Sequence, residues 1–319
     1  MKIIAELCQN HKGNFSILKN MVQSASEYGA THVKIQHIYS KNLSRRGIFE
    51  NGEIKNNKII TIKRPYKQEY KRLKKLELNR NDIIKFVTLC NQYKVIPLTT
   101  CFAREHIKEI KNLDFKEIKV ASYDCSSYQM LRELKKNFSH IYLSTGASYN
   151  QEIKKASDIL KNNFSLLHCV TEYPTKINNV NLSRLNFLRN FSSEVGYSDH
   201  TNPEQDKLLA SLSSIYFGAK ILERHFTILP KDKTRDGPVS INPTELMIIK
   251  SFTKLSKTDQ LKELKKLNFK RNILLGSKNL QMTHEEKLNR DYYRGRFVSF
   301  ANDKRGKFEV FNWEETPIN

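Results

Sequence analysis

The feature that most constrains the fold of this chain is a regular alternation of short apolar segments with segments of helical periodicity. Eight apolar or β-branched runs follow one another: KIIAEL (2–7), THVKIQ (31–36), KVIPLTT (94–100), FKEIKVAS (115–122), HIYLST (140–145), FSLLHC (164–169), EVGYS (194–198) and AKILERHF (219–226). Most are separated by a helical pattern such as 15–30, whose shared apolar face contains Ile17, Met21, Val22 and Ala25. Strands that alternate with helices pair in parallel through right-handed crossovers. Eight such units in about 225 residues predict an α/β fold, a (β/α)8 TIM barrel, rather than an open doubly wound sheet.

The spacing of the runs also predicts how the chain is organised. One gap is irregular: about 60 residues separate the second run from the third, which predicts an inserted loop over the barrel mouth, at roughly 38–75. We expect residues 1–285 to form the barrel domain and residues 286–319 to form a short C-terminal tail.

The formal charge of +22 suggests a nucleic-acid partner at first sight. However, the lysines are spread over the whole chain, and the densest basic stretch, 55–78, contains no recognised nucleic-acid-binding motif. We interpret the charge as solvated helix faces, with attraction of acidic substrates or surfaces and nucleic-acid binding as alternatives. We therefore expect no nucleic-acid partner.

The cysteines and the N-terminus predict the cellular compartment. The five cysteines, at 8, 90, 101, 125 and 169, show no paired spacing, which is typical of reduced thiols. The N-terminal segment turns polar after a few apolar residues, and no run of about 18 apolar residues follows. We expect a cytoplasmic protein that does not associate with membranes.

Polar residues gather where the predicted strands end. Active sites of (β/α)8 barrels lie at the C-terminal rim of the strands. The rim positions are occupied by Glu6, Lys34, Gln36, Thr100, Lys119, Ser122, Ser144, Thr145, His168, Ser198, Asp199, His200, Glu223 and His225. Ordinary turn residues would suffice to close the strands of a barrel without a site. This set therefore predicts an active site.

The rim residues indicate two kinds of ligand. Lys34 and Lys119, placed among hydroxyl groups, would hold a phosphorylated or polycarboxylated anion. His200 and His225, from adjacent strands, suit a divalent cation such as Mn, Fe, Co or Zn, with coordination positions left for water and substrate. Together they favour a metal that polarises a carbonyl group while a phosphorylated partner reacts with it.

Each rim residue also has a purely structural interpretation. His200 could cap a loop, and His225 could be a hydrogen-bonded core histidine. His168 could equally belong to the core or support a ligand from behind. Single Ser and Thr residues close many strands. Their joint placement at one rim nevertheless favours a functional site.

Eight motifs, in this order, resemble the sialic acid synthase family, which comprises N-acetylneuraminate, legionaminate and pseudaminate synthases. They are IAELCQNHKGN (4–14), ATHVKIQ (30–36), LTTCF (98–102), IKVASYD (118–124), LSTGAS (143–148), LLHCVTEYPT (166–175), VGYSDHT (195–201) and ILERHFT (221–227). The resemblance covers roughly residues 1–285. It implies a C–C bond-forming transferase that condenses phosphoenolpyruvate with an open-chain amino sugar, an N-acetylmannosamine-like aldose. The products would be a sialic-acid-like nonulosonic acid and phosphate.

The resemblance also implies roles for individual residues. It implies that His200 and His225 bind a divalent metal, Mn²⁺, with Mg²⁺ or Co²⁺ as alternatives, and act in catalysis together with Glu6 and Asp124. The implied phosphoenolpyruvate ligands are Lys34, Thr100, Lys119, Ser122, Ser144 and Ser198. The residues implied to face the sugar are Glu6, Gln36, Asp124 and Tyr173, with Asp124 where many relatives carry Glu.

Three features depart from the pattern of the family. Relatives usually carry a Gly-Pro-Asp whose carboxylate contacts the sugar, whereas this chain has Val239 there; we expect Asp236 to substitute, unless the sugar lacks the group that Asp reads. Thr171 stands where some relatives have Asn. The tail, 286–319, resembles only the junction into the antifreeze-like cap domain that the family commonly carries, and the chain then stops.

These departures leave alternatives open. The chain could use a different, non-acetylated aldose, or it could be a non-catalytic barrel that binds to or regulates a complete synthase. The full set of rim lysines and histidines favours catalysis. The expected partners are phosphoenolpyruvate and an aldose, with a homodimer or a separate polypeptide that supplies the cap as further expectations.

Overall fold

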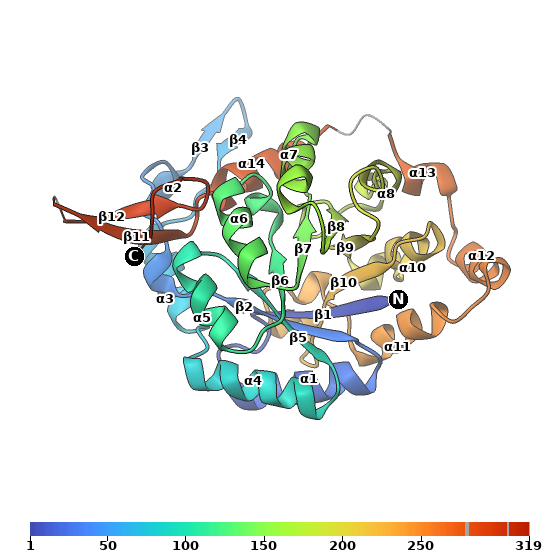
Figure 1. Cartoon of the computed structure of the whole chain (residues 1–319). Helices are drawn as coiled ribbons and strands as arrows, with labels where there is room; N and C mark the ends of the chain where they lie inside the picture. Colours follow the sequence, from blue (N-terminus) through green and yellow to red (C-terminus); the bar gives the residue numbers. More distant parts are fainter. Residues whose placement is uncertain (278–280, 305, 319) are drawn as a thin grey trace.

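The chain folds around a closed barrel of parallel strands (Figure 1). The computed structural model describes residues 1–277, 281–304 and 306–318. Within them, eight strands close the barrel in the order β1-β10-β9-β8-β7-β6-β5-β2. Their bounds are β1 (Lys2–Cys8), β2 (His32–His37), β5 (Ile96–Cys101), β6 (Glu117–Val120), β7 (His140–Ser144), β8 (Phe164–Cys169), β9 (Val195–Asp199) and β10 (Ile221–His225). The predicted (β/α)8 fold is confirmed, and each strand lies within two residues of its predicted bounds.

Helices cover the outside of the barrel. They are α1 (Phe15–Glu27), α4 (Arg80–Gln92), α5 (Ile107–Asn112), α6 (Tyr128–Asn137), α7 (Asn150–Leu160), α8 (Arg184–Leu188), α9 (Pro203–Asp206), α10 (Leu209–Tyr216), α11 (Pro243–Phe252), α12 (Lys257–Lys266) and α13 (Arg271–Leu275). Short 3₁₀ turns are η1 (Ser40–Asn42), η2 (Arg104–His106), η3 (Ser122–Asp124), η4 (Ile177–Asn179), η5 (Lys231–Lys233) and η6 (Gly237–Val239). No helix in the described ranges is long and apolar enough to span a membrane.

Helix α1 shows how the sequence pattern produces these elements. The Asn14 side chain caps its N-terminus by accepting hydrogen bonds from two backbone amides of the first turn. The face that packs on the barrel consists of Leu18, Met21, Val22 and Ala25. Ile17, predicted to share that face, lies at its edge and is only partly buried. The apolar spacing thus fixes which side of the helix faces the strands.

The barrel interior is filled by side chains below the rim. Its apolar layer consists of Ile4, Leu98, Tyr142, Leu167 and Ile221. Gly196 on β9 lies beside Ile221, and a Cβ atom at Gly196 would come within 2.6 Å of the Ile221 Cβ atom. The interior is therefore a packed core that closes the barrel beneath the site. All five cysteines are free and buried.

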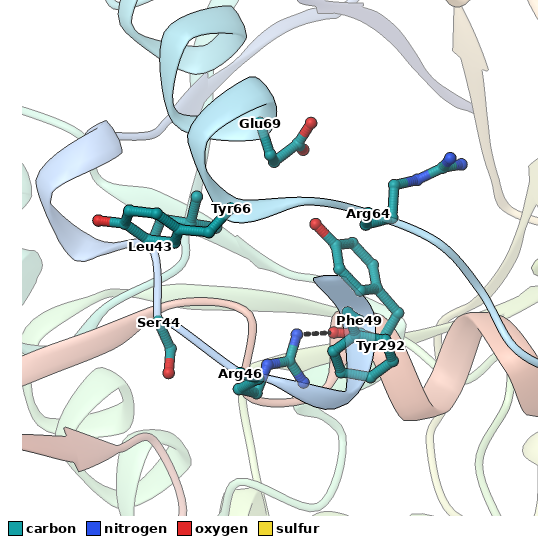
Figure 2. A pocket seen from close by; sticks show the side chains of 8 residues that line it. All are labelled: Leu43, Ser44, Arg46, Phe49, Arg64, Tyr66, Glu69 and Tyr292. Carbon is teal, nitrogen blue, oxygen red and sulfur yellow. Dashed lines mark hydrogen bonds between the residues drawn. The ribbon is translucent and has the colours of Figure 1, made fainter. Parts of the chain in front are cut away.

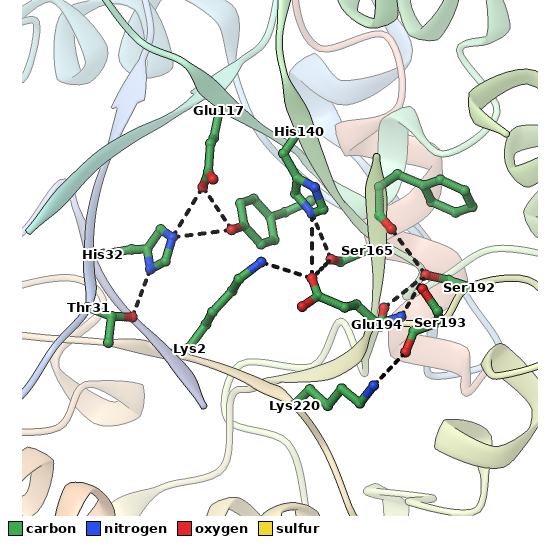
Figure 3. Close-up of polar contacts among 12 residues, drawn as sticks. Lys2, Thr31, His32, Glu117, His140, Ser165, Ser192, Ser193, Glu194 and Lys220 are labelled. Carbon is green, nitrogen blue, oxygen red and sulfur yellow. Dashed lines mark hydrogen bonds and ion pairs between the residues drawn. The ribbon is translucent and has the colours of Figure 1, made fainter. Parts of the chain in front are cut away.

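A hydrogen-bonded network joins the N-terminal ends of the strands (Figure 3). Glu117 accepts from Tyr142 at 2.8 Å and lies 3.1 Å from His32 Nε2. Beside it, Lys2 pairs with Glu194 at 2.8 Å. These residues lie at the end of the barrel opposite the rim, where polar networks serve stability rather than catalysis.

The predicted insertion at 38–75 contains secondary structure of its own. It comprises η1, α2 (Ile48–Asn51), an antiparallel hairpin of β3 (Glu53–Lys55) and β4 (Lys58–Thr61), and α3 (Tyr66–Lys74). In Figure 1 these elements lie at the same end of the barrel as the C-terminal segments. The insertion therefore does belong to the barrel mouth.

The C-terminal segments pack against the insertion. They are α14 (His284–Tyr293) and an antiparallel hairpin of β11 (Val298–Asp303) and β12 (Gly306–Phe311). Leu43 forms a β-bridge with Phe297. The Arg46 guanidinium donates to the backbone oxygen of Tyr292 (Figure 2) and also to that of Arg294. The predicted division of the chain at residue 285 falls within α14, and the division into two domains stays a prediction.

Candidate active site

A pocket opens at the C-terminal ends of the barrel strands. It encloses about 450 Å³, part of it open to solvent. Its lining consists of Glu6, Lys34, Gln36, Thr100, Phe102, Lys119, Ala121, Ser122, Tyr123, Ser144, Cys169, Tyr173, Ser198, His200, Glu223 and His225. Of the residues to which the family resemblance assigns a role, the structure thus brings together all except Asp124 and Asp236. We call this cavity the rim pocket.

Parallel pairing explains why these side chains meet. Glu6 on β1 lies in register with His225 on β10 and with Lys34 on β2. Ser198 is likewise in register with Glu223. Because strand side chains alternate between the two faces, residues at matching heights on neighbouring strands point into the barrel together.

Lys34 lies between two carboxylates at the bottom of the rim pocket. Its Nζ contacts the Glu6 carboxylate, lies 2.8 Å from Glu223 Oε1 and donates to Thr100 at 3.0 Å. Burial opposes its positive charge, but Glu223 and Glu6 raise the pKa of Lys34 well above its ordinary value. Lys34 is therefore a permanent cation whose charge is already balanced.

Lys119 is less well balanced. Its Nζ donates to Ser144 at 2.6 Å and to the Val120 carbonyl at 3.1 Å, and it lies 3.5 Å from Glu223 Oε2. Burial lowers the pKa of Lys119 below its ordinary value, although Glu223 opposes this. An anion bound beside Lys119 and Ser144 would stabilise the charged form of this lysine.

Glu223 connects the two lysines and had no assigned role in the sequence-based prediction. Burial disfavours its negative charge, yet Lys119 and Lys34 keep the pKa of Glu223 well below its ordinary value. The sequence could have indicated that Glu223 belongs to the site, because Glu223 and His225 are two residues apart on one strand and so share a face.

The two histidines face one cavity. The ring centroids of His200 and His225 are 5.3 Å apart. His200 Nδ1 lies 3.1 Å from the Val170 carbonyl, a hydrogen bond that leaves Nε2 with a free lone pair. Burial, followed by the proximity of His225, lowers the pKa of His200 to about 3, so that the imidazole is neutral. His225 Nδ1 is buried and has no hydrogen-bond partner among the described residues. Two imidazoles, each with a ring nitrogen that has no hydrogen-bond partner among the described residues, fit a shared divalent cation.

Asp236 lies beside this pair. One donor atom each from Cys8, His225 and Asp236 lie within 4.8 Å of one another. Asp236 therefore belongs to the histidine side of the site, next to the rim pocket. Its contact with a sugar stays a prediction.

Asp124 lies in a smaller neighbouring pocket. Its Oδ1 accepts from Ser127 at 2.7 Å and from Asn312 at 3.0 Å, and burial raises its pKa. Arg296 lines the same small pocket. The structure therefore does not bring Asp124 to the histidines. It connects Asp124 to the tail, through a residue 188 positions away that no local sequence pattern could indicate.

Residues at the edge of the rim pocket are held by neighbouring elements. The Gln36 amide accepts from Gln9 at 3.3 Å, and Gln9 in turn accepts from Arg72 of the insertion at 2.6 Å. Tyr173 is half exposed, with its ring centroid 4.4 Å from that of His200. Ser122 Oγ accepts from the Gly146 amide at 3.1 Å. The insertion thus positions part of the pocket.

Three rim candidates point elsewhere. His168 Nε2 lies 2.7 Å from the Val180 carbonyl, so this residue belongs to the core. Asp199 forms a fully buried pair with Arg224 at 2.8 Å. Thr145 donates to the Leu167 carbonyl at 3.1 Å. None of the three lines the rim pocket.

The fold and the site define a class: a (β/α)8 barrel with a lysine-lined, histidine-paired pocket at its rim. The chain belongs to the NeuB family of sialic and nonulosonic acid synthases, because the family profile matches residues 21–263. This confirms the resemblance found in the sequence.

Named relatives agree with this assignment, and solved structures agree with the fold. The N,N'-diacetyllegionaminic acid synthase of Campylobacter jejuni is 30% identical over 304 residues, which cover 88% of this chain and 85% of that protein. The synthase of the same name from Legionella pneumophila is 31% identical over 256 residues, 76% of this chain and 68% of that protein. The spore coat polysaccharide biosynthesis protein SpsE of Bacillus subtilis superposes with a TM-score of 0.71 at 23% identity, over 91% of this chain and 77% of its own. The N-acetylneuraminic acid synthetase of Leptospira borgpetersenii superposes with a TM-score of 0.67 at 24% identity, over 91% of this chain and 90% of its own.

Proposed function

We propose that this protein condenses phosphoenolpyruvate with the open-chain aldehyde of an amino sugar to give a nonulosonic acid and phosphate. The observation that carries the proposal is the rim pocket, in which Lys119 and Ser144 lie on one side and His200 and His225 on the other. Membership of the NeuB family supports it, as do relatives named as legionaminic and pseudaminic acid synthases.

The lysine side of the pocket would bind phosphoenolpyruvate. Lys119 and Ser144 donate to its phosphate or carboxylate oxygens, with Thr100, Ser122 and Ser198 as further hydroxyl donors. Lys34 supplies a second fixed positive charge. Glu223 stays ionised and holds both ammonium groups in place before the substrate arrives. This arrangement orients an anion without a large rearrangement of charge.

The histidine side would bind the sugar aldehyde. A divalent cation held by His200 and His225, Mn²⁺ in our proposal, would polarise the aldehyde and a water molecule. C3 of phosphoenolpyruvate then forms a bond to the aldehyde carbon, water adds at C2, and phosphate leaves with cleavage of the C2–O bond. Tyr173 and Gln36, at the pocket edge, would orient the sugar. Glu6, buried against Lys34, keeps that lysine charged.

The identity of the aldose is a separate question. We propose an N-acetylated amino sugar, by analogy with the named relatives. A non-acetylated aldose is a second candidate, because Val239 is buried and brings no carboxylate to the pocket. A non-catalytic barrel is less well supported, since the rim pocket contains both lysines and both histidines.

The proposal is tested by incubating the purified protein with Mn²⁺, phosphoenolpyruvate and a panel of amino sugars. Release of phosphate together with a nonulosonic acid identified by mass spectrometry is expected with at least one sugar. His200→Ala and His225→Ala are expected to abolish turnover and to leave the fold intact. No phosphate release across a broad panel, or full activity of both variants, would contradict it. A homodimer, a separately encoded cap and a cytoplasmic location stay predictions.

A further inference from the structure

Three side chains that commonly bind metals gather outside the barrel wall at the end of β2. His37 is the last residue of β2, His106 ends η2, and Glu109 lies in α5. One donor atom from each lies within 4.8 Å of the other two. His106 and Glu109 are three residues apart, a spacing that places both on one face of a helical turn. None of the three lines the rim pocket, and the proposed function assigns them no role.

His37 is a buried imidazole without a hydrogen bond. Its side chain is 1% exposed, and neither ring nitrogen has a hydrogen-bond partner among the described residues. The Nε2 atom points to Glu109, with Oε2 at 3.5 Å. Burying a polar group without a partner costs about 1–3 kcal/mol. A cation bound to the lone pair of Nε2 would offset this cost.

The hydrogen bonds around His106 determine its tautomer. Asn42 donates through Nδ2 to Glu105 at 2.9 Å and to the Val298 carbonyl at 2.8 Å, so its Oδ1 faces His106 Nε2 at 2.9 Å. His106 Nε2 therefore carries the proton, and Nδ1 presents its lone pair to Glu109 Oε2 at 3.0 Å. Two lone pairs at this distance repel each other unless a proton or a cation lies between them.

We propose that His37, His106 and Glu109 form a binding site for Zn²⁺, separate from the rim pocket. Two imidazoles and one carboxylate are a ligand set that Zn²⁺ accepts. Tetrahedral Zn²⁺ with bonds of about 2.1 Å holds its ligand atoms roughly 3.4 Å apart. The two imidazole nitrogens lie 3.0 and 3.5 Å from Glu109 Oε2, which fits this geometry. A water molecule would complete the coordination shell.

The surroundings indicate a structural role for this ion. Asn42, which orients His106, also bonds to Val298 at the start of β11. Glu105, which lies 3.4 Å from His106, accepts from the Phe300 amide at 2.9 Å. A bound Zn²⁺ would therefore fix the exit of β2 to α5 and, through these two residues, to the tail.

The test measures zinc binding in a protein whose rim histidines are removed. Full-length His200→Ala/His225→Ala protein is stripped with chelator, and Zn²⁺ binding is followed by equilibrium dialysis and by the Tm. We expect about one Zn²⁺ per chain and a Tm that rises with zinc concentration. Because the rim pair is absent from this protein, the result does not depend on the proposed function.

Additional substitutions locate the ion. Glu109→Gln, which keeps the shape of a side chain that is 28% exposed, is expected to abolish tight binding. Asn42→Ala should weaken it by about 10- to 100-fold, because the residue behind a ligand orients it. His140→Gln, a matched change at the opposite end of the barrel, should leave binding unchanged.

Two results would overturn the proposal. The first is that the parent protein, His200→Ala/His225→Ala, binds no zinc or gives no tetrahedral absorption spectrum with Co²⁺. In that case a proton on His106, and not a metal ion, would lie between His106 and Glu109. The other is a Glu109→Gln protein that binds zinc as tightly as its parent. The Co²⁺ spectrum is measured on the parent protein alone, so it tests the proposed site even if the Glu109 or Asn42 variant fails to fold.

Discussion

At the scale of single residues, the site depends on how buried charges are balanced. Lys34 has two carboxylates beside it, whereas Lys119 has one at 3.5 Å and two neutral acceptors. A buried lysine without a close counter-ion loses affinity for its proton. This inequality marks Lys119 as the lysine that an incoming anion would complete.

Lys119→Ala tests this assignment. We expect the KM for phosphoenolpyruvate to rise about 10-fold or more, because one charged hydrogen bond of roughly 1.5–3 kcal/mol is lost, while the KM for the sugar changes less. Steady-state kinetics with each substrate varied in turn measures both constants. Lys116→Ala is the control, because Lys116 is exposed and directly precedes β6, the strand that contains Lys119. A larger rise in the KM for the sugar than in the KM for phosphoenolpyruvate would contradict the assignment.

Glu117 allows a pH test at the opposite end of the barrel (Figure 3). Burial alone would raise its pKa, but contacts from His32 and Tyr142 lower it below the ordinary 4.5. A lowered carboxyl pKa stabilises the fold at pH values above the ordinary pKa, and this contribution disappears as the pH falls through the folded-state pKa.

We therefore expect Glu117→Gln to lower the free energy of unfolding by about 1–2 kcal/mol near pH 7. The difference from the parent should shrink as the pH falls below 4.5. Urea unfolding at both pH values measures it, with the exposed Glu27→Gln as control. A difference that stays constant with pH would be inconsistent with the lowered pKa.

At the scale of elements, local patterns predicted the barrel well. All eight strands could be predicted because each is a short apolar run, and the rim followed from the geometry of parallel strands. The hairpin of β3 and β4 was not predicted, although Asn56 and Asn57 both adopt the positive φ of its turn. Its strands are almost fully exposed, so they show no apolar alternation.

Gly196→Ala tests the packing inside the barrel. A Cβ atom there would lie 2.6 Å from both the Cβ and the backbone oxygen of Ile221, so the neighbouring strand must move. We expect a loss of about 1–3 kcal/mol in the free energy of unfolding, measured in urea. Gly47→Ala is the control, because a Cβ at Gly47 would meet nothing within 4 Å. Equal effects of the two changes would refute tight packing at Gly196.

At the scale of the whole molecule, the insertion and the tail pack together beside the mouth. Leu43 and Leu73 of the insertion form a small apolar cluster with Phe297. Asn312 reaches back to Asp124 beside the rim pocket. Such contacts could not be predicted from the sequence, because they join segments far apart in the chain and follow no periodicity. The arrangement implies that the insertion and the tail stabilise each other.

Phe297→Ala is expected to loosen both segments. Removing a buried Phe side chain typically costs about 3–5 kcal/mol. Hydrogen exchange should therefore become faster in α3 and in the β11–β12 hairpin, and stay unchanged in β1. Phe308→Ala, on the exposed face of the same hairpin, is the control. Faster exchange in the tail alone would show that the two segments are independent.

The central claim is that one pocket holds a cation between two histidines and an anion beside a lysine. Anomalous diffraction from crystals soaked with Mn²⁺ and phosphoenolpyruvate tests it most directly. The account predicts a manganese peak bonded to His200 Nε2 and to His225, with an oxyanion of phosphoenolpyruvate in contact with Lys119 and Ser144. Manganese bound away from both histidines, or phosphoenolpyruvate bound outside the rim pocket, would contradict it.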